Sequence, residues 1–220
     1  MQVYLGRDGI SYSPTTIHKY MNKLLGSKSI VRPKKPAYKY GKAHKVFENK
    51  IHQDFTAPEI NQKWCTDFTY LFLSDRDVRY NCSILDLHDR SVIASITDRN
   101  ITSDLAIRTL QKALDSQPAI NGPLILHSDQ GSQFTSKALI EFCESVHITQ
   151  SMSKAGYPYD NAPMERYFNT LKNECINLYE YDEEDALYQA VEEFAYVEYN
   201  YVRPHSYNGY ATPHEARINS

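Results

Sequence analysis

Hydrophobic and polar positions alternate with a period of two over residues 63–98, and this pattern predicts β-strands. In "KWCTDFTYLFL" every second residue from Trp64 to Tyr70 belongs to one set, and the residues between them form the other. "VRYNCSILDLHD" and "SVIASITD" follow as two further strand-like segments, after short turns at 74–77 and 88–90. The pattern therefore predicts a three-stranded antiparallel meander.

After residue 100 the pattern changes to helices that alternate with short apolar strands. Helices are predicted in "TSDLAIRTLQKALDS", "SKALIEFCESV", "NAPMERYFNTLKNECINL" and "DEEDALYQAVEEFAYVEYNY", and buried strands in "PLILHS" and "ITQSM". A meander followed by this alternation predicts an α/β fold, in which helices flank both faces of a mixed five-stranded sheet.

Near the N-terminus, "SYSPTTIHKYMNKLLG" has the signals of a single helix. Ser13 suits the N-cap, Pro14 the first helical position, and Gly26 the position after the end. Such a helix could be the second helix of a helix-turn-helix, with polar residues offered to DNA. Residues 1–12 are too short and irregular to hold the full partner helices, so we predict a partial helix-turn-helix.

Charge separates the N-terminal quarter from the rest of the chain. Residues 1–56 hold eleven Lys or Arg and three acids, a formal charge of +8, whereas the whole chain carries −3 and the other 164 residues carry −11. A basic arm on an acidic body favours contact with polyanions, although a solvated tail explains the charge equally well. The predicted domains are a partial helix-turn-helix at 1–27, a basic linker at 28–58, a main domain at 59–180, and a C-terminal helix and tail at 181–220.

The composition is that of an ordinary globular protein, with 41% hydrophobic and 23% charged residues. No apolar run approaches the roughly 20 residues that cross a bilayer, and the N-terminus lacks a signal-peptide core. The four cysteines lie far apart, with no C-x-x-C pair. This spacing predicts reduced, buried thiols in a cytoplasmic protein rather than disulfides or a zinc site.

Three acidic residues stand out because of the elements that carry them. Asp67 lies inside the first strand, Asp129 ends the strand "LILHS", and Glu165 lies on the long helix. Acids from two strands and a helix can converge at one end of the sheet, where they repel unless they are protonated or bound to cations. Oxygen ligands suit Mg²⁺ or Mn²⁺. Two such ions about 4 Å apart activate a water or hydroxyl and stabilise the leaving oxygen of a phosphodiester.

Each acid also has a purely structural interpretation. Asp129, which precedes Gln-Gly, could form an Asx-turn. Glu165 could be a first-turn acid that the helix dipole favours, and Asp67 could pair with an arginine. Asp86, which also lies on a strand, remains an alternative member of the group.

The spacing and the surrounding motifs resemble a known family. Thirty-five residues separate Asp129 from Glu165, and Lys172 follows seven residues later. This resembles the Asp-Asp-35-Glu pattern of the retroviral-integrase superfamily. "WCTDFTYL", "HSDQGSQFTS", "SMSKAGYPYDNAPMERYFNTLKNE" and "YNYVRPHSYNGYATPHEA" resemble one branch of it, the bacterial insertion-sequence transposases made from a second reading frame. The resemblance extends from about residue 63 to the end.

The resemblance implies a ribonuclease H-like integrase catalytic core that performs DNA strand transfer with two Mg²⁺ (or Mn²⁺) ions. The implied catalytic and metal-binding residues are Asp67, Asp129 and Glu165. The implied DNA contacts are Lys172 at the element's terminal DNA, Lys154, Gly156 and Asn161 around the start of the long helix, and, from the basic arm, Lys19 and Lys23.

The resemblance also sets expectations about partners. Such transposases act on element ends and target DNA, which favours a homo-oligomer on DNA in the bacterial cytoplasm, associated with the nucleoid when bound. They carry a fuller helix-turn-helix, often on a partner reading-frame product. No cysteine precedes Cys65, so the zinc domain of retroviral integrases is not expected. The alternatives are a truncated fragment that only binds DNA and a ribonuclease H-like nuclease that cuts without joining.

Overall fold

The computed structural model describes residues 1–27, 45–117, 120, 122–154 and 157–219. The chain divides into two units, Met1–Ala37 and Tyr38–Ser220. The sequence instead predicted boundaries at residues 27, 58 and 180. Ile51 and Leu187 are buried in the same core as Leu85 of the sheet. Described residues on both sides of the predicted main domain therefore pack in the core of the larger unit.

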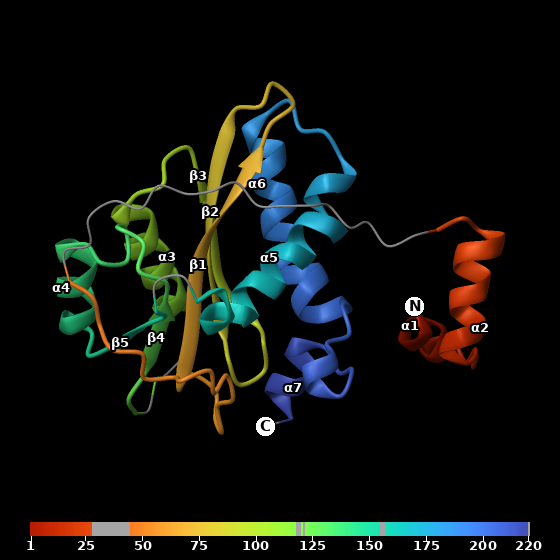
Figure 1. Ribbon diagram of the computed structural model, residues 1–220, viewed down its shortest axis with the longest axis horizontal. Helices are drawn as coiled ribbons and strands as arrows, with labels where there is room; N and C mark the ends of the chain where they lie inside the picture. The colour runs from red at the N-terminus through yellow and green to blue at the C-terminus, as the bar shows by residue number, and fades with distance from the viewer. Residues whose placement is uncertain (28–44, 118–119, 121, 155–156, 220) are drawn as a thin grey trace. The chain divides into compact units, whose positions relative to one another are not determined.

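The smaller unit contains two α-helices and a π-helix, namely α1 (Gln2–Arg7), α2 (Pro14–Lys19) and η1 (Tyr20–Leu24) (Figure 1). The Ser13 hydroxyl caps α2 by accepting a hydrogen bond from the Thr16 N–H at 3.1 Å, as its position in the sequence predicted. The predicted single helix changes to π geometry at Tyr20. In addition, the six-residue helix α1 forms within residues 1–12, the segment predicted to be too short and irregular to hold the full partner helices.

The larger unit is built on a five-stranded mixed sheet with the order β3-β2-β1-β4-β5. The first three strands pair antiparallel, as the predicted meander requires, whereas β1–β4 and β4–β5 pair parallel. The predicted fold class is thus confirmed. The strands are β1 (Lys63–Phe72), β2 (Val78–Asp86), β3 (Val92–Asp98), β4 (Ile125–Ser128) and β5 (Thr149–Met152).

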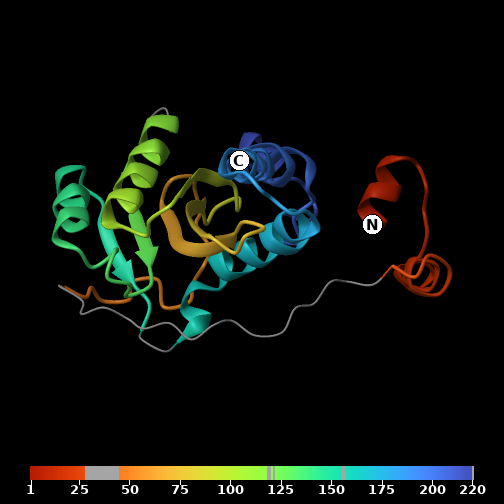
Figure 2. The ribbon, with the colours of Figure 1, turned by 90° about the horizontal axis from the view of Figure 1, so that it is seen from above.

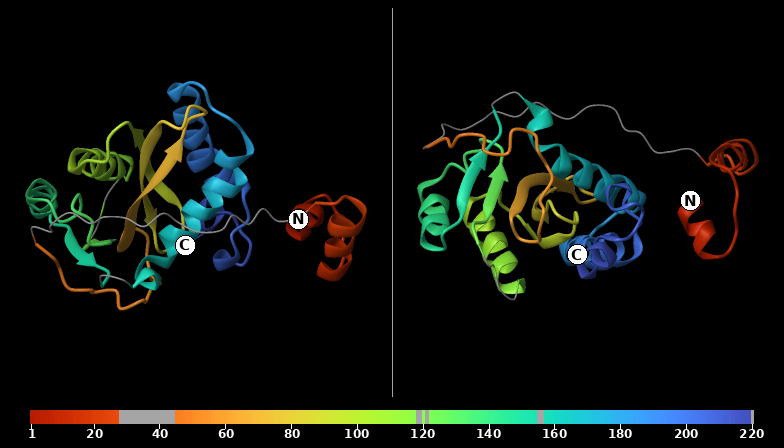
Figure 3. Two further views of the ribbon diagram at one scale, coloured as in Figure 1. Left: turned by 45° about the horizontal axis from the view of Figure 1, so that its top comes forward. Right: turned by 90° about the horizontal axis from the view of Figure 1, so that it is seen from below.

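Helices cover both faces of this sheet. Figures 1 and 2 show α3 (Ser103–Ser116) and α4 (Lys137–Ser145) on one side and α5 (Ala162–Glu174) and α6 (Glu184–Glu193) on the other. The views in Figure 3 show the same three layers. The side chains of Thr102 and Ser136 cap α3 and α4 by accepting hydrogen bonds from the N–H groups at N3.

The alternation along β1 divides the interior into two cores. Trp64 packs in a core with Leu110 of α3 and Leu139 of α4. Its neighbour Cys65 packs in the other core, with Leu171 of α5. Successive side chains of a strand point to opposite faces, so the period-two pattern of the sequence fills both layers.

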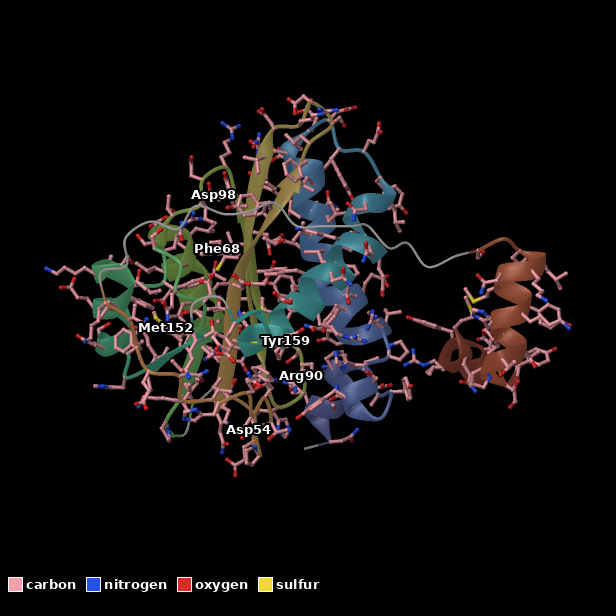
Figure 4. The ribbon with its side chains drawn as sticks, viewed as in Figure 1. Asp54, Phe68, Arg90, Asp98, Met152 and Tyr159 are labelled. Carbon is pink, nitrogen blue, oxygen red and sulfur yellow. The ribbon has the colours of Figure 1, made fainter. Side chains whose placement is uncertain are left out.

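The C-terminal segment folds back onto the turn between β2 and β3. After α5 it contains η3 (Ile176–Leu178), α6, the π-helix η4 (Phe194–Val202), η5 (Ser206–Asn208) and α7 (Pro213–Ile218). The guanidinium of Arg217 on α7 forms ion pairs with Asp86 at 3.2 Å and Asp89 at 2.6 Å. The guanidinium of Arg90, labelled in Figure 4, lies 3.8 Å from the centre of the Tyr207 ring. The tail motif therefore holds this turn in place.

Two further findings concern the cysteines and helices that could span a membrane. All four cysteines are free thiols, three of them buried, as their spacing predicted. Across the part of the chain that the structure describes, no helix has the length and apolar character that crossing a membrane demands.

Candidate functional site

Asp67 and Asp129 lie on adjacent strands that run in the same direction. The register of β1 and β4 pairs Cys65 with His127. Continuing that register by two residues brings Asp67 level with Asp129, which follows the last residue of β4. Parallel neighbours lie about 4.8 Å apart. Residues two apart share a face, so Asp67 lies on the face of Cys65, the one that α5 covers.

The Asp129 carboxylate takes part in a tight local turn. Its Oδ1 accepts a hydrogen bond from the Gly131 N–H at 2.8 Å, which is the Asx-turn considered from the sequence. Burial raises the pKa of Asp129 and outweighs the lowering effect of this bond. A Cβ at residue 131 would lie 2.9 Å from Asp129 Oδ1, so the close approach requires glycine. The turn leaves a half-buried acid beside β1.

The pKa of Tyr70, further along β1, is affected by both carboxylates. Burial is the largest cause of the raised pKa of its hydroxyl. The neighbouring Tyr80 is the next cause, followed by the negative charges of Asp129 and Asp67. Both acids therefore lie close enough to Tyr70 to act on its hydroxyl. Together with the register of β1 and β4, this puts the two predicted site residues in the same part of the sheet.

The position of Glu165 depends on where α5 begins. The 3₁₀ turn η2 (Pro158–Asn161) leads directly into α5, and Tyr159, labelled in Figure 4, marks this point. The side-chain N–H of Asn161 donates to the Thr66 carbonyl at 3.1 Å. Thr66 is the residue before Asp67, and Glu165 follows Asn161 by about one helical turn. The start of α5 is therefore tied to the strand that carries the first acid.

The donor atoms of this region suit a hard divalent cation. The two aspartates offer only oxygen, the ligand type that Mg²⁺ and Mn²⁺ prefer. Asn161 Oδ1 is buried and has no hydrogen-bond partner among the residues described. The described ranges nevertheless hold no group of three or more His, Cys, Asp or Glu side chains arranged around a metal position. The aspartate pair fits such an ion, whereas Glu165 is on the adjacent helix without completing a three-carboxylate group.

The predicted DNA-contact residues are distributed over both units. Lys172 is half-buried in the last turn of α5, and Lys154 is exposed after β5. Lys19 and Lys23 are exposed in the smaller unit. Gly156 lies outside the described residues.

Asp86, the alternative acid, serves a different purpose. Its carboxylate accepts hydrogen bonds from the N–H groups of Asn61 at 2.8 Å and His88 at 3.0 Å, and it pairs with Arg217. It lies opposite Trp64, at the end of β1 away from Asp67. The Asp–Arg pairing that the sequence suggested as an alternative thus occurs at Asp86, which leaves it outside the site.

The sequence interpretation missed two residues that organise this region, Asp160 and His127. Asp160 is buried although Tyr157 and Tyr159 just before it are exposed, and its carboxylate accepts three hydrogen bonds. His127 is fully buried on β4, two residues before Asp129. The only sequence signal was an acid placed directly before Asn161, in a segment otherwise read as a loop.

Comparison with known proteins agrees with this arrangement. Two family models, both described as "Integrase core domain", match residues 57–158 and 146–213. The Shigella sonnei "Insertion element IS600 uncharacterized 31 kDa protein" is 33% identical over 168 residues, covering 76% of this chain and 61% of that protein. The Escherichia coli "Transposase InsF for insertion sequence IS3A" is 34% identical over 170 residues, covering 77% of this chain and 58% of that protein. The chain thus spans about three fifths of the length of these relatives.

The fold has a counterpart among solved structures. The catalytic core domain of HTLV-2 integrase in complex with magnesium aligns with a TM-score of 0.54 and 21% identity, covering 73% of this chain and 99% of that one. At this identity the likeness concerns the fold, a ribonuclease H-like core. The two matched models together show an integrase core domain over residues 57–213, and over most of its length the chain is similar to IS3-type transposases.

Proposed function

We propose that the chain catalyses metal-dependent DNA strand transfer during the transposition of a bacterial insertion sequence. The observation that supports this proposal is the register of β1 and β4 in an integrase-type fold, because continuing it by two residues would bring Asp67 beside Asp129. Two neighbouring half-buried acids on parallel strands are unfavourable unless a proton or a cation compensates their charge. The 33–34% identity to insertion-sequence proteins supports DNA as the substrate.

In this proposal Asp67, Asp129 and Glu165 hold two Mg²⁺ or Mn²⁺ ions. The solved HTLV-2 integrase core contains magnesium, which supports the choice of metal. When bound, the ions lower the pKa of the attacking water or hydroxyl and stabilise the leaving oxygen of the phosphodiester. The chain's own contribution is to hold the carboxylates, through the turn at Gly131 and the tie between Asn161 and Thr66.

DNA would be held by residues around the same edge of the sheet and by the basic arm. Phosphate contacts by lysine position the DNA and weaken with salt. The proposed contacts are Lys172, Lys154, Gly156 and Asn161 in the larger unit and Lys19 and Lys23 in the smaller one. Because two element ends must be joined to one target, we propose a homo-oligomer on DNA. A partner reading-frame product would supply the full helix-turn-helix.

The test uses a labelled duplex with a free 3′-hydroxyl end, at low salt, with Mg²⁺ or Mn²⁺. The wild type is compared with Glu165→Gln and with the matched control Glu174→Gln, which changes an exposed glutamate on the same helix. We expect lengthened products that require the metal, disappear with Glu165→Gln and persist with Glu174→Gln. DNA binding by gel shift should be equal in all three proteins.

The other outcomes point to the remaining alternatives. Shortened products without lengthened ones would replace strand transfer by a nuclease function. Equal joining by the Glu165→Gln protein would remove Glu165 from the site. A wild type that binds DNA but gives no product would contradict autonomous catalysis, and adding the partner reading-frame product would then show whether a missing module restores it.

A further inference from the structure

Asp160 connects the start of α5 to the segment that precedes the sheet. Its side chain is 4% exposed, and its two carboxylate oxygens accept three hydrogen bonds. Gln53 donates its side-chain N–H to Oδ1 at 2.7 Å, and Asn49 donates to Oδ2 at 3.2 Å. The Lys154 backbone N–H also donates to Oδ2, at 3.0 Å. One buried carboxylate therefore joins residues 49–53, the loop after β5 and the start of the helix that carries Glu165.

A second route connects the same elements through His127. Its Nε2 lies 2.8 Å from the Asp160 carbonyl, and its Nδ1 lies 2.9 Å from the Ser151 hydroxyl. A carbonyl oxygen only accepts, so Nε2 carries the proton and Nδ1 accepts from Ser151. The Ser151 oxygen in turn accepts from the Lys50 N–H at 2.9 Å. The chain of bonds runs from the preceding segment through β5 and β4 to residue 160.

The backbone of the preceding segment is bent to present these donors. His52 and Gln53 both have positive φ values, 50° and 62°. For residues other than glycine such conformations cost of order 1 kcal/mol or more, and persist only where the surroundings enforce them. Asn49 Oδ1 holds the bend by accepting from the N–H groups of Ile51 and His52. The bend then directs the Gln53 amide to Asp160.

We propose that Asp160 is a positioning residue that ties residues 49–53, in the segment that precedes the sheet, to the start of the helix carrying Glu165. The inference deepens the proposed function and rests on it for its catalytic consequence. Asn161, the next residue, is bonded to Thr66 beside Asp67, so the position of residue 160 sets where α5 begins relative to the aspartate pair. A change in the segment leading from the arm is thereby transmitted to the third carboxylate.

The test exchanges donor and acceptor across the bond between Gln53 and Asp160. Gln53→Glu keeps the length of the side chain but places a carboxylate against the Asp160 carboxylate, so acceptor faces acceptor and no rotation of either group makes the bond. Adding Asp160→Asn supplies an N–H group on the facing side chain and restores the bond. The matched control is Asp54→Asn, a neighbouring aspartate whose side chain is 59% exposed and paired with Lys63 instead (Asp54 is labelled in Figure 4).

Three quantities are measured for each protein: DNA affinity, the rate of joining at saturating DNA, and amide hydrogen exchange of the peptide covering 157–168. Gln53→Glu should lower the joining rate by about tenfold or more, the usual effect of losing a contact that orients a ligand. DNA affinity should stay within about twofold, and exchange at the start of α5 should become faster. The double variant should recover both rate and exchange, and the control should match the wild type.

The exchange measurement separates failure of this inference from failure of the proposed function. If the wild type joins no DNA, the proposed function fails, while faster exchange that the double variant reverses still supports the tie. Unchanged exchange in Gln53→Glu overturns the tie in every case. Faster exchange with an unchanged joining rate overturns its role in positioning Glu165, and so does a rate that falls and is not restored by adding Asp160→Asn.

Discussion

At the residue scale, Gly131 determines where the Asp129 carboxylate can lie. The Asp129 oxygen accepts from the Gly131 N–H, and the space where a Cβ would sit is filled by that same oxygen and by Gln133 Oε1 at 3.3 Å. A side chain at residue 131 must therefore displace the acid. This constraint is local, but it acts on one of the two carboxylates that the sheet brings together.

We expect Gly131→Ala to lower the joining rate by about 100-fold, since a misplacement of roughly 1 Å at a reacting centre has an effect of that size. Stability should fall by only about 1 kcal/mol, because the far end of a flexible side chain can move. The control is Gly6→Ala, where nothing lies within 4 Å of the added Cβ. Steady-state joining assays and urea unfolding check both values, and an active, equally stable Gly131→Ala protein would contradict the prediction.

Burial of Asp129 leads to a second prediction at this scale. Because burial raises its folded-state pKa, the ionised carboxylate destabilises the metal-free protein above that pKa. Asp129→Asn removes the charge and keeps the acceptor for Gly131. The free energy of unfolding in EDTA at pH 7 should therefore rise. The gain should shrink as the pH falls through the folded-state pKa and vanish below the unfolded value of about 3.9.

Urea unfolding at several pH values measures this difference. Asp75→Asn is the matched control, because Asp75 makes the same kind of turn with the Asp77 N–H at 2.8 Å but is exposed. It should show no comparable gain at pH 7. A metal-free Asp129→Asn protein that is less stable than the wild type at pH 7 would disprove the argument.

At the scale of elements, α7 and the β2–β3 turn stabilise each other. Thr212 and Glu215 form a capping box at the start of α7, and Arg217 near its end reaches two acids whose side chains are 0% exposed. Arg217 directly follows the sequence motif "YNYVRPHSYNGYATPHEA". The structure explains the motif as the segment that carries this cation to Asp86 and Asp89.

Arg217→Ala should lower the free energy of unfolding by about 3 kcal/mol, because it leaves two buried acids without their cation. Arg99→Ala is the control. Arg99 pairs with Glu184, but its side chain is 67% exposed, so its removal should cost below about 1 kcal/mol. Urea unfolding at pH 7 compares the two proteins, and equal losses would show that the buried pairs do not stabilise α7.

At the scale of the whole molecule, the C-terminal helices belong to the same core as the sheet. Val191 and Phe194 are buried together with Met164 and Leu171 of α5. By contrast, Met1–Ala37 forms a unit of its own. The distribution of core residues therefore predicts which part of the chain can be removed.

A protein comprising residues 38–220 should unfold cooperatively with a melting temperature within a few degrees of the full chain. A protein that ends at residue 180 should lose its cooperative transition and its near-ultraviolet circular dichroism, because one layer of the core is missing. Circular dichroism of both proteins provides the measurement. A cooperative transition in the protein ending at 180 would restore the boundary that the sequence predicted there.

The sequence by itself predicted the strands and helices of the larger unit, since period-two and period-3.6 patterns reflect which side of an element is buried. It also identified Asp67 and Asp129 as acids at the ends of, or within, buried strands. The N-terminal unit was less well predicted, because short helices such as α1 depend on local capping rather than on a long pattern.

Tertiary structure alone decided the contacts between residues far apart in the chain. The register of β1 and β4, continued by two residues, sets the two aspartates level. The packing of α7 near the turn between β2 and β3 brings Arg217 to Asp86, the acid that the sequence left as an alternative. Likewise, only the folded chain brings Gln53 and Asn49 to Asp160. The sequence pattern indicates that an acid is buried. Its partner depends on which strands and segments pack together, and the local sequence does not contain this information.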